Sequence, residues 1–172
     1  MDALDNIFKR ASIRNFTDQM ISEEDLKTIL KAGMCGPSCV NSRDWSFIVV
    51  RDKEMLQKMA EANGRPAEPL KKADVGILVC GDLSRSFKGA IDYWIIDGSI
   101  ACENMLLAAH ALGIGSVWLG TYPQMDRVNR QKELFHLPEE IVPHSILAFG
   151  YPAEEKTGKG FYEEDRVHFE KW

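Results

Sequence analysis

The sequence has no long uninterrupted apolar run, and this excludes a membrane-spanning helix. Its most apolar stretch, residues 91–112, is interrupted by Asp92, Asp97, Glu103 and Asn104, whereas a span needs about 20 consecutive and predominantly apolar residues. The first residues also lack the basic region and apolar segment of a secretory signal. We therefore expect a cytoplasmic protein with no membrane partner.

An excess of positive charge is missing as well. The 172 residues include 21 Lys+Arg and 26 Asp+Glu, which gives a formal net charge of -5 at pH 7. Because nucleic-acid binding generally needs a basic face, we expect no nucleic-acid partner and only a local positive site. The sequence also has no Gly-x-x-x-x-Gly-Lys-Ser/Thr segment, and its glycines from Gly113 to Gly120 lack the spacing of a dinucleotide-binding loop.

Cysteine is scarce and badly spaced for a metal. The four cysteines are Cys35, Cys39, Cys80 and Cys102. None stands with another cysteine or a histidine at the spacing of a zinc site, so we expect no metal. Cys35 and Cys39 are separated by three residues instead of the two of a redox dithiol, and a part for either thiol in redox chemistry stays open.

The apolar periodicity predicts one domain that alternates helices and strands. Residues 2–11 have apolar side chains at helical spacing and are expected to form a helix whose apolar stripe faces inward. Ser22 begins a capping-box-like segment for a second helix that ends near Gly33. We further expect strands at 45–50, 75–80, 116–119 and 145–149, helices at 55–59 and 125–135, and a loop at 63–69.

Two segments predict an association between chains. The helix expected at 91–112 is apolar almost all round, so it must be covered on every side. A second copy of the same helix would cover it, although an ordinary central core helix is the alternative. The aromatic segment 161–172 is poorly suited to lie in water, so we expect it to cross to a partner subunit.

The most informative motif is Arg10-Ala11-Ser12-Ile-Arg14. Two guanidinium groups and a hydroxyl at alternate positions suit a phosphate, because arginine offers a planar fork of donors and serine adds a neutral hydrogen bond. About 25 residues later comes Gly36-Pro-Ser-Cys-Val-Asn41-Ser-Arg-Asp-Trp45.

These two motifs, together with the segments 97–112, 113–120 and 149–152, resemble the nitroreductase family in order and spacing over nearly the whole chain. The resemblance implies an α+β fold, a three-layer α/β/α sandwich with a mixed, mainly antiparallel sheet around a central apolar helix. It also implies an arm-exchanged homodimer, in which residues 1–160 are a single FMN-binding domain and residues 161–172 are the C-terminal arm.

The same resemblance implies a binding site for flavin mononucleotide (FMN). Three groups of residues would contribute to it: Arg10, Ala11, Ser12 and Arg14 at the phosphate and ribityl end; Pro37, Ser38 and Asn41 along the ring, with Asn41 a candidate to reach over from the opposite subunit; and the backbone of Trp118, Leu119 and Gly120. The family often has an arginine before the aromatic residue of its arm, whereas this chain has Lys159 two residues before Phe161. Either Lys159 replaces that charge, or the phosphate depends on Arg10 and Arg14.

The implied activity is the transfer of two electrons from NADH or NADPH through FMN to a small electrophilic acceptor such as a nitroaromatic or a quinone, in a ping-pong sequence. The flavin N5 would carry the chemistry, so no catalytic side chain is assigned. A flavin-binding or sensing module without NAD(P)H turnover, or another flavin chemistry on this fold, is the alternative. We expect Arg85, Phe87, Tyr93 and Trp94 to line the substrate side of the site; the alternative is that the aromatic residues only pack the start of the helix.

Overall fold

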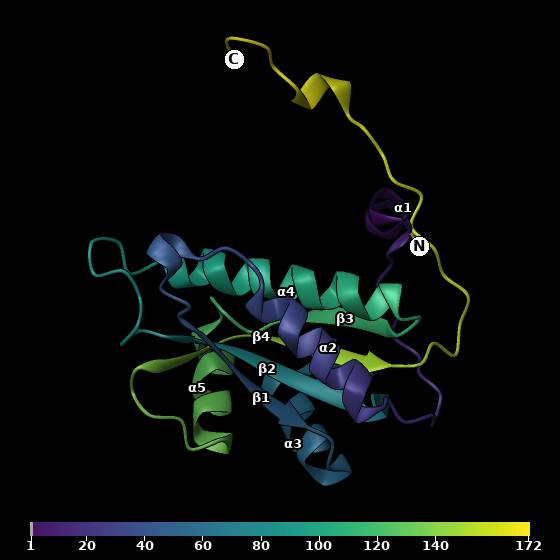
Figure 1. Cartoon of the computed structure of the whole chain (residues 1–172). Helices are drawn as coiled ribbons and strands as arrows, with labels where there is room; N and C mark the ends of the chain where they lie inside the picture. Colours follow the sequence, from purple (N-terminus) through teal and green to yellow (C-terminus); the bar gives the residue numbers. More distant parts are fainter. Residues whose placement is uncertain (1) are drawn as a thin grey trace.

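The protein contains one four-stranded sheet in the order β1-β2-β4-β3, as shown by a computed structural model that describes residues 2–172 (Figure 1). Every neighbouring pair of strands in it is antiparallel. The strands are β1 (Trp45–Val50), β2 (Val75–Asp82), β3 (Gly115–Gly120) and β4 (Ile141–Gly150). One isolated parallel bridge, between Ser12 and Ser116, continues the sheet beyond β3.

Helices cover both faces of the sheet (Figure 1). One layer contains α2 (Glu23–Met34) and α4 (Tyr93–Ala111), and the other contains α3 (Lys53–Asn63), the 3-10 helix η2 (Arg65–Lys72) and α5 (Met125–Leu134). The two central strands are buried almost throughout because apolar side chains from both helical layers pack on them. This arrangement confirms the expected α+β fold with three layers.

The element boundaries differ from the sequence prediction in two places. Residues 65–72 form a 3-10 helix where a loop was expected, because Pro66 stands in its first turn, where its fixed φ and missing N–H are tolerated. β4 begins at Ile141, four residues earlier than expected. This part of the strand contains Pro143, a residue that is unusual inside a sheet because it has no N–H to donate. The structure accommodates Pro143 next to a register shift between Val79 and Cys80 of β2.

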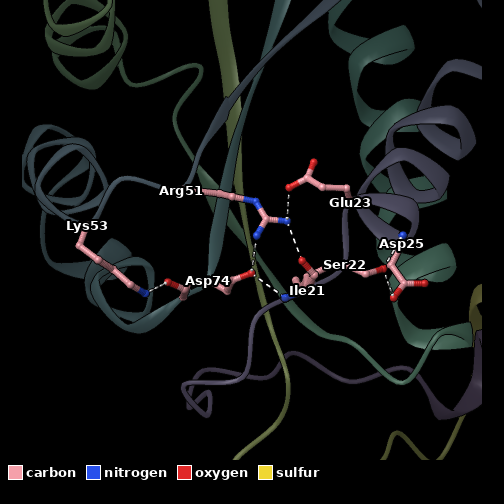
Figure 2. A network of polar contacts seen from close by, with 8 residues as sticks. Ile21, Ser22, Glu23, Asp25, Arg51, Lys53 and Asp74 are labelled. Carbon is pink, nitrogen blue, oxygen red and sulfur yellow. Dashed lines mark hydrogen bonds and ion pairs between the residues drawn. The ribbon is translucent and has the colours of Figure 1, made fainter.

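A polar cluster attaches the start of α2 to the sheet (Figure 2). Arg51, which follows β1, donates a 2.7 Å hydrogen bond from Nη2 to the carbonyl oxygen of Ile21. Asp74, which precedes β2, accepts a 2.8 Å bond from the backbone N–H of Ile21 and lies 3.4 Å from Nη1 of Arg51. Both polar backbone groups of buried Ile21 are therefore satisfied, and α2 begins next to this point, with Ser22 as its N-cap.

The first helix, α1 (Ala3–Lys9), does not bury its apolar stripe, so that prediction is wrong for the single chain. Leu4, Ile7 and Phe8 are between 52% and 61% exposed. The face toward α4 is polar instead: Asn6 donates from Nδ2 to the carbonyl oxygen of Leu107 at 3.0 Å, and its Oδ1 lies 2.7 Å from Nδ1 of His110. Periodicity identified the helix correctly but did not reveal which face the rest of the chain would cover.

The C-terminal segment leaves the body of the protein after Gly158. The N–H of Gly158 donates to the carbonyl oxygen of Lys9 at 2.8 Å, and residues 161–172 then extend away past α1 (Figure 1). The short 3-10 helix η3 (Glu164–Arg166) is their one regular element. Four aromatic side chains in this segment are largely exposed, namely Phe161, Tyr162, Phe169 and Trp172. Within residues 2–172, no helix is both long enough and apolar enough to cross a membrane.

Candidate functional site

The N-terminal motif is extended and lies along the outer edge of β3. The N–H of Ile13 donates to the carbonyl oxygen of Ser116 at 2.9 Å, and Ser12 forms the bridge with Ser116. Alternate side chains of an extended segment share one face. Arg10, Ser12 and Arg14 therefore share a face, while the side chain of Ile13, only 5% exposed, points into the core.

Several cationic side chains lie near this face, and they differ in whether they already have an ion-pair or hydrogen-bond partner. Arg10 Nε lies 3.6 Å from Glu103 Oε1 of α4. Lys156 donates from Nζ to the carbonyl oxygen of Ser12 at 3.1 Å. The guanidinium of Arg14 is exposed and makes no ion pair with residues 2–172, although its backbone N–H donates to Glu154 and thereby lowers the pKa of that carboxyl group. Of the two arginines in the motif, Arg14 is therefore the one more available to an anionic ligand.

Lys159 lies near the same region, although the structure shows no bond from its side chain. The backbone of the preceding residue, Gly158, approaches so closely that an added Cβ would lie 2.6 Å from the carbonyl oxygen of Arg10. A residue with a side chain would clash there. Lys156, which the sequence argument did not assign to the site, is the lysine that contacts the motif.

The segment Trp118–Gly120 presents backbone groups at the open edge of β3. Because the carbonyl of Ser116 points outward to Ile13, the backbone groups of Trp118 and Gly120 point the same way. The carbonyl oxygen of Gly120 accepts two bonds, from Asn63 Nδ2 at 3.1 Å and from Arg127 Nη1 at 2.9 Å. No backbone group in residues 2–172 accepts from the N–H of Trp118 or Gly120 at this edge.

Asn63 holds the turn after β3 in place, and the sequence did not predict this role. It is fully buried at the end of α3. Its Oδ1 accepts from Thr121 Oγ1 at 2.8 Å while its amide holds Gly120. One buried amide thus orients the turn that follows β3.

An aromatic cluster lies beneath the first turns of α4. The ring centroids of Trp94 and Tyr122 are 4.9 Å apart, and those of Trp118 and His144 are 5.8 Å apart. Trp94 is only 4% exposed and fits tightly over Gly81, where an added Cβ would lie 2.4 Å from its ring. The alternative interpretation, in which it packs the start of the helix, therefore describes Trp94.

The other proposed substrate residues are at the surface. Arg85 is exposed, Phe87 is 39% exposed and Tyr93 is 42% exposed. They belong to the segment between β2 and the start of α4, so their side chains are accessible to a ligand.

His144 is held as a neutral side chain within the cluster. Its Nε2 lies 3.0 Å from the carbonyl oxygen of Ile95, which can only accept, so Nε2 carries the proton. Its Nδ1 lies 2.9 Å from Ser145 Oγ, which donates to it. Burial lowers the pKa of His144, so it supports the cluster without a charge at neutral pH.

The second motif forms a tightly held loop around the 3-10 helix η1 (Cys39–Asn41). The N–H of Cys39 lies 3.1 and 3.0 Å from the two carboxylate oxygens of Asp97 on α4. Ser38 Oγ accepts from the N–H of Arg43 at 3.0 Å, and Asn41 Oδ1 accepts from its Nε at 3.1 Å. Val40, Asn41 and Arg43 have positive φ values of 47°, 56° and 51°. Residues other than glycine keep such a conformation only where the surrounding structure enforces it.

One chain does not bring the two motifs together. The N-terminal motif meets α4 at Glu103, whereas the loop at 37–41 meets it at Asp97. Six helical residues correspond to about 9 Å along the axis and about 120° around it. The single chain thus combines Arg10, Ser12 and Arg14 with the edge of β3, and leaves Pro37, Ser38 and Asn41 on another side of α4.

A cavity of about 970 Å³ lies between residues 11–17 and 152–157. Of the predicted cofactor residues only Ala11 lines this cavity. Arg14 instead borders a separate hollow of about 310 Å³ with Lys72 of η2. Neither cavity of the single chain therefore contains the predicted set of residues.

Comparison with known proteins identifies close relatives of this architecture. The sequence model of the Nitroreductase family matches residues 7–95 and 66–151. The chain is 48% identical to the "Putative NADH dehydrogenase/NAD(P)H nitroreductase" of Archaeoglobus fulgidus, covering 99% of both proteins. It is 30% identical to an FMN reductase (NAD(P)H) of Bacillus subtilis, covering 99% of this chain and 74% of that protein.

Solved structures agree with the sequence relatives. The crystal structure of a protein of the same name as the Archaeoglobus relative, from Bacteroides thetaiotaomicron, superposes with a TM-score of 0.92 at 41% identity and covers 99% of this chain and 98% of that one. An FMN-dependent nitroreductase from Clostridium difficile superposes with a TM-score of 0.88 at 32% identity and covers 98% of this chain and 99% of the other.

Proposed function

The chain belongs to the nitroreductase family, and on that premise we propose that it holds FMN between two copies of itself and passes two electrons from NAD(P)H to a small electrophilic acceptor. It is an FMN-dependent NAD(P)H oxidoreductase. When bound, FMN supplies the two-electron transfer, and the protein supplies binding, orientation and access. The observation that carries the proposal is the shared face of Arg10, Ser12 and Arg14 beside the open edge of β3.

The residues at this face fit the phosphate of FMN. Arg14 has no ion pair among residues 2–172, and Arg10 has a single partner, Glu103, at the long distance of 3.6 Å. Both guanidinium groups can therefore reach a dianionic phosphate without breaking a strong bond. Ser12 stands between them and adds a hydroxyl donor. Lys159 follows Gly158, whose backbone lies against that of Arg10, and would add a point charge.

The edge of β3 fits the polar rim of a flavin ring. Trp118 and Gly120 direct outward N–H groups that have no backbone acceptor among residues 2–172, and the missing side chain of Gly120 leaves open space there. The carbonyl of Gly120 is already bound by two donors. Hydrogen-bond acceptors on the ring, and not donors, are thus the preferred partners of this residue.

The second copy completes the site in this proposal. Because Pro37, Ser38 and Asn41 lie on another side of α4, they reach a flavin bound at Arg10 only from a partner subunit. An interface is also supported by the exposed apolar stripe of α1 and by Ile96 of α4, which is 53% exposed. Residues 161–172 act as an arm that crosses to the partner, while residues 1–160 form the flavin-binding domain.

The acceptor side is proposed to lie under the segment between β2 and α4. Arg85, Phe87 and Tyr93 are accessible there, with Trp94 packed beneath them as support. A guanidinium and two aromatic rings suit a flat, electron-poor acceptor such as a nitroaromatic or a quinone.

The decisive experiment compares FMN with riboflavin in Arg14→Ala. Loss of one charge-assisted contact to the phosphate is expected to weaken FMN binding about thirtyfold, while riboflavin binding stays unchanged. Arg130→Ala is the matched control, because Arg130 is an exposed arginine on α5 that pairs with Asp126. Equal FMN affinity in parent and Arg14→Ala would overturn the phosphate assignment.

The assembly is tested by deleting residues 161–172. Light scattering at micromolar concentration is expected to give a dimer for the full chain, and deletion is expected to weaken both the dimer and flavin retention. A monomer that still holds FMN would contradict a site between subunits.

The activity itself predicts that the bound flavin bleaches with NADH or NADPH and recolours when an acceptor is added. A flavin that neither donor bleaches would identify a binding module without turnover.

A further inference from the structure

Two aspartates, Asp44 and Asp97, are buried behind the loop at 37–41, within reach of each other. Asp44 is fully buried and Asp97 is 3% exposed. Both oxygens of Asp97 accept from the N–H of Cys39, and Ser42 Oγ lies 3.5 Å from Oδ2. Oδ2 of Asp44 accepts from Ser86 Oγ at 2.8 Å, whereas its Oδ1 is buried with no hydrogen-bond partner among residues 2–172.

No cation compensates the pair. Within residues 2–172 neither carboxylate belongs to an ion pair, and the nearby guanidinium of Arg43 is bonded to Asn41. Three other titratable residues neighbour the pair. Cys39 of η1 is bonded to Asp97, the backbone of Asp82 of β2 is bonded to Asp44, and His144 of β4 packs against Gly98, the residue after Asp97.

None of these three groups is positively charged at neutral pH. Burial and the two carboxylates raise the pKa of the Cys39 thiol, so it stays protonated. Burial lowers the pKa of His144, which is neutral. The N–H of Asp82 donates to the carbonyl oxygen of Asp44 at 2.6 Å, but its carboxylate brings a further negative charge.

Two carboxyl groups in such surroundings cannot both be ionised without a large cost. Asp44 lies within hydrogen-bonding reach of Asp97, and burial, followed by this neighbour, raises the pKa of Asp97. A proton held between them would also satisfy the otherwise unpaired Oδ1 of Asp44.

We propose that Asp44 and Asp97 share one proton, and that this hydrogen-bonded pair positions the loop at 37–41 for the flavin. The pair acts through the loop and is a positioning pair, since neither carboxyl group is exposed to a ligand. The part that concerns flavin rests on the function proposed above; the shared proton does not.

The pair also joins the two sides of the proposed site. Asp97 belongs to α4 and holds the loop through Cys39. Asp44 precedes β1 and holds Ser86, which stands between Arg85 and Phe87 of the acceptor segment. One proton therefore links the cofactor loop to the segment that would receive the acceptor.

The shared proton is tested directly by infrared spectroscopy of the flavin-free protein. We expect a protonated-carboxyl stretching band near neutral pH that disappears in Asp97→Asn and in Asp44→Asn. Each variant keeps the hydrogen bonds, because the asparagine amide donates where the proton was and its carbonyl accepts the existing donor. Two independent variants keep the test usable if one of them fails to fold. Absence of the band in the parent protein from about pH 5.5 to about pH 8 would overturn the proposal.

The positioning role is tested by the pH dependence of FMN affinity. Since the ordered loop retains the proton, raising the pH removes it and weakens FMN binding, by at least about threefold between about pH 6 and about pH 9. Asp97→Asn is expected to abolish this dependence. Asp74→Asn is the control, because Asp74 is a buried aspartate that is ion-paired with Arg51 and far from the loop in the sequence; it should keep the pH dependence of the parent protein.

The outcomes separate the two proposals. A protein that shows the infrared band but never binds FMN would contradict the proposed function and leave the shared proton established. A protein that binds FMN with the same pH dependence in the parent and in Asp97→Asn would overturn the positioning role of the pair.

Discussion

Replacing Asn63 with alanine should destabilise the protein and loosen the turn after β3. Asn63 is fully buried and makes two hydrogen bonds: its amide donates to the carbonyl oxygen of Gly120 and its Oδ1 accepts from Thr121. In Asn63→Ala, Gly120 keeps Arg127 as a donor, but the buried hydroxyl of Thr121 loses its acceptor. An unsatisfied buried group together with a lost hydrogen bond amounts to about 3 kcal/mol of unfolding free energy.

A matched variant isolates the buried contribution. Arg127→Ala removes the other donor to the same carbonyl oxygen, from a position open to water. Water can replace that donor, so the loss of stability should be much smaller. Both variants are compared with the parent protein by urea denaturation without flavin.

A double-mutant cycle identifies the cause. Thr121→Val removes the hydroxyl while preserving the shape of the side chain, so adding it to Asn63→Ala should recover about 1 kcal/mol or more. A loss in Asn63→Ala below about 1 kcal/mol, or strict additivity of the two substitutions, would refute the account of this turn.

Three further predictions concern the rest of the structure. Asp74→Ala leaves the N–H of Ile21 and Nη1 of Arg51 without their acceptor, so urea denaturation should show a loss of about 3 kcal/mol. The lowered pKa of His144 means that the folded protein binds this proton less tightly than the unfolded chain, so the unfolding free energy should fall as the pH drops below the ordinary value of 6.5, with a shallower slope in His144→Gln. Burial raises the pKa of Cys80 to about 12, and alkylation followed by mass spectrometry should find this thiol unreacted in the native protein.

Much of the fold was predictable because the local composition of several segments indicates a strand. Residues 45–50 were identified from aromatic and β-branched side chains and residues 75–80 from an unbroken apolar run, and both segments lie in strands. The Ser22 cap likewise predicted where α2 begins. Errors occurred at two prolines. Pro66 is compatible with a loop and with the first turn of a helix. Pro143 is unusual inside a strand, and β4 tolerates it beside a register shift.

The candidate site was predictable only in its surface-facing parts. Arg10, Ser12 and Arg14 alternate in the sequence, and alternate side chains of an extended segment lie on the same face. Asn63 gave no comparable signal, since a polar residue near a helix end is usually solvated and only the tertiary structure buries it. Asp97 did carry a signal, because an acid within an apolar helix needs a hydrogen-bond partner, but the sequence could not show that Asp44 lies within its reach.

The apolar surfaces that remain exposed connect the fold to the proposed site. An apolar helix such as α4 has to be covered on every side, yet Ile96 is 53% exposed and the stripe of α1 also faces outward. These surfaces flank α4, which carries both Glu103, beside Arg10, and Asp97, beneath the loop at 37–41. A second chain that covered α4 would therefore bury apolar surface and bring its own loop toward the arginines in the same step. Under the proposed function, one event thus covers the exposed apolar surface and completes the site, so a substitution that weakens the proposed dimer should weaken flavin binding as well.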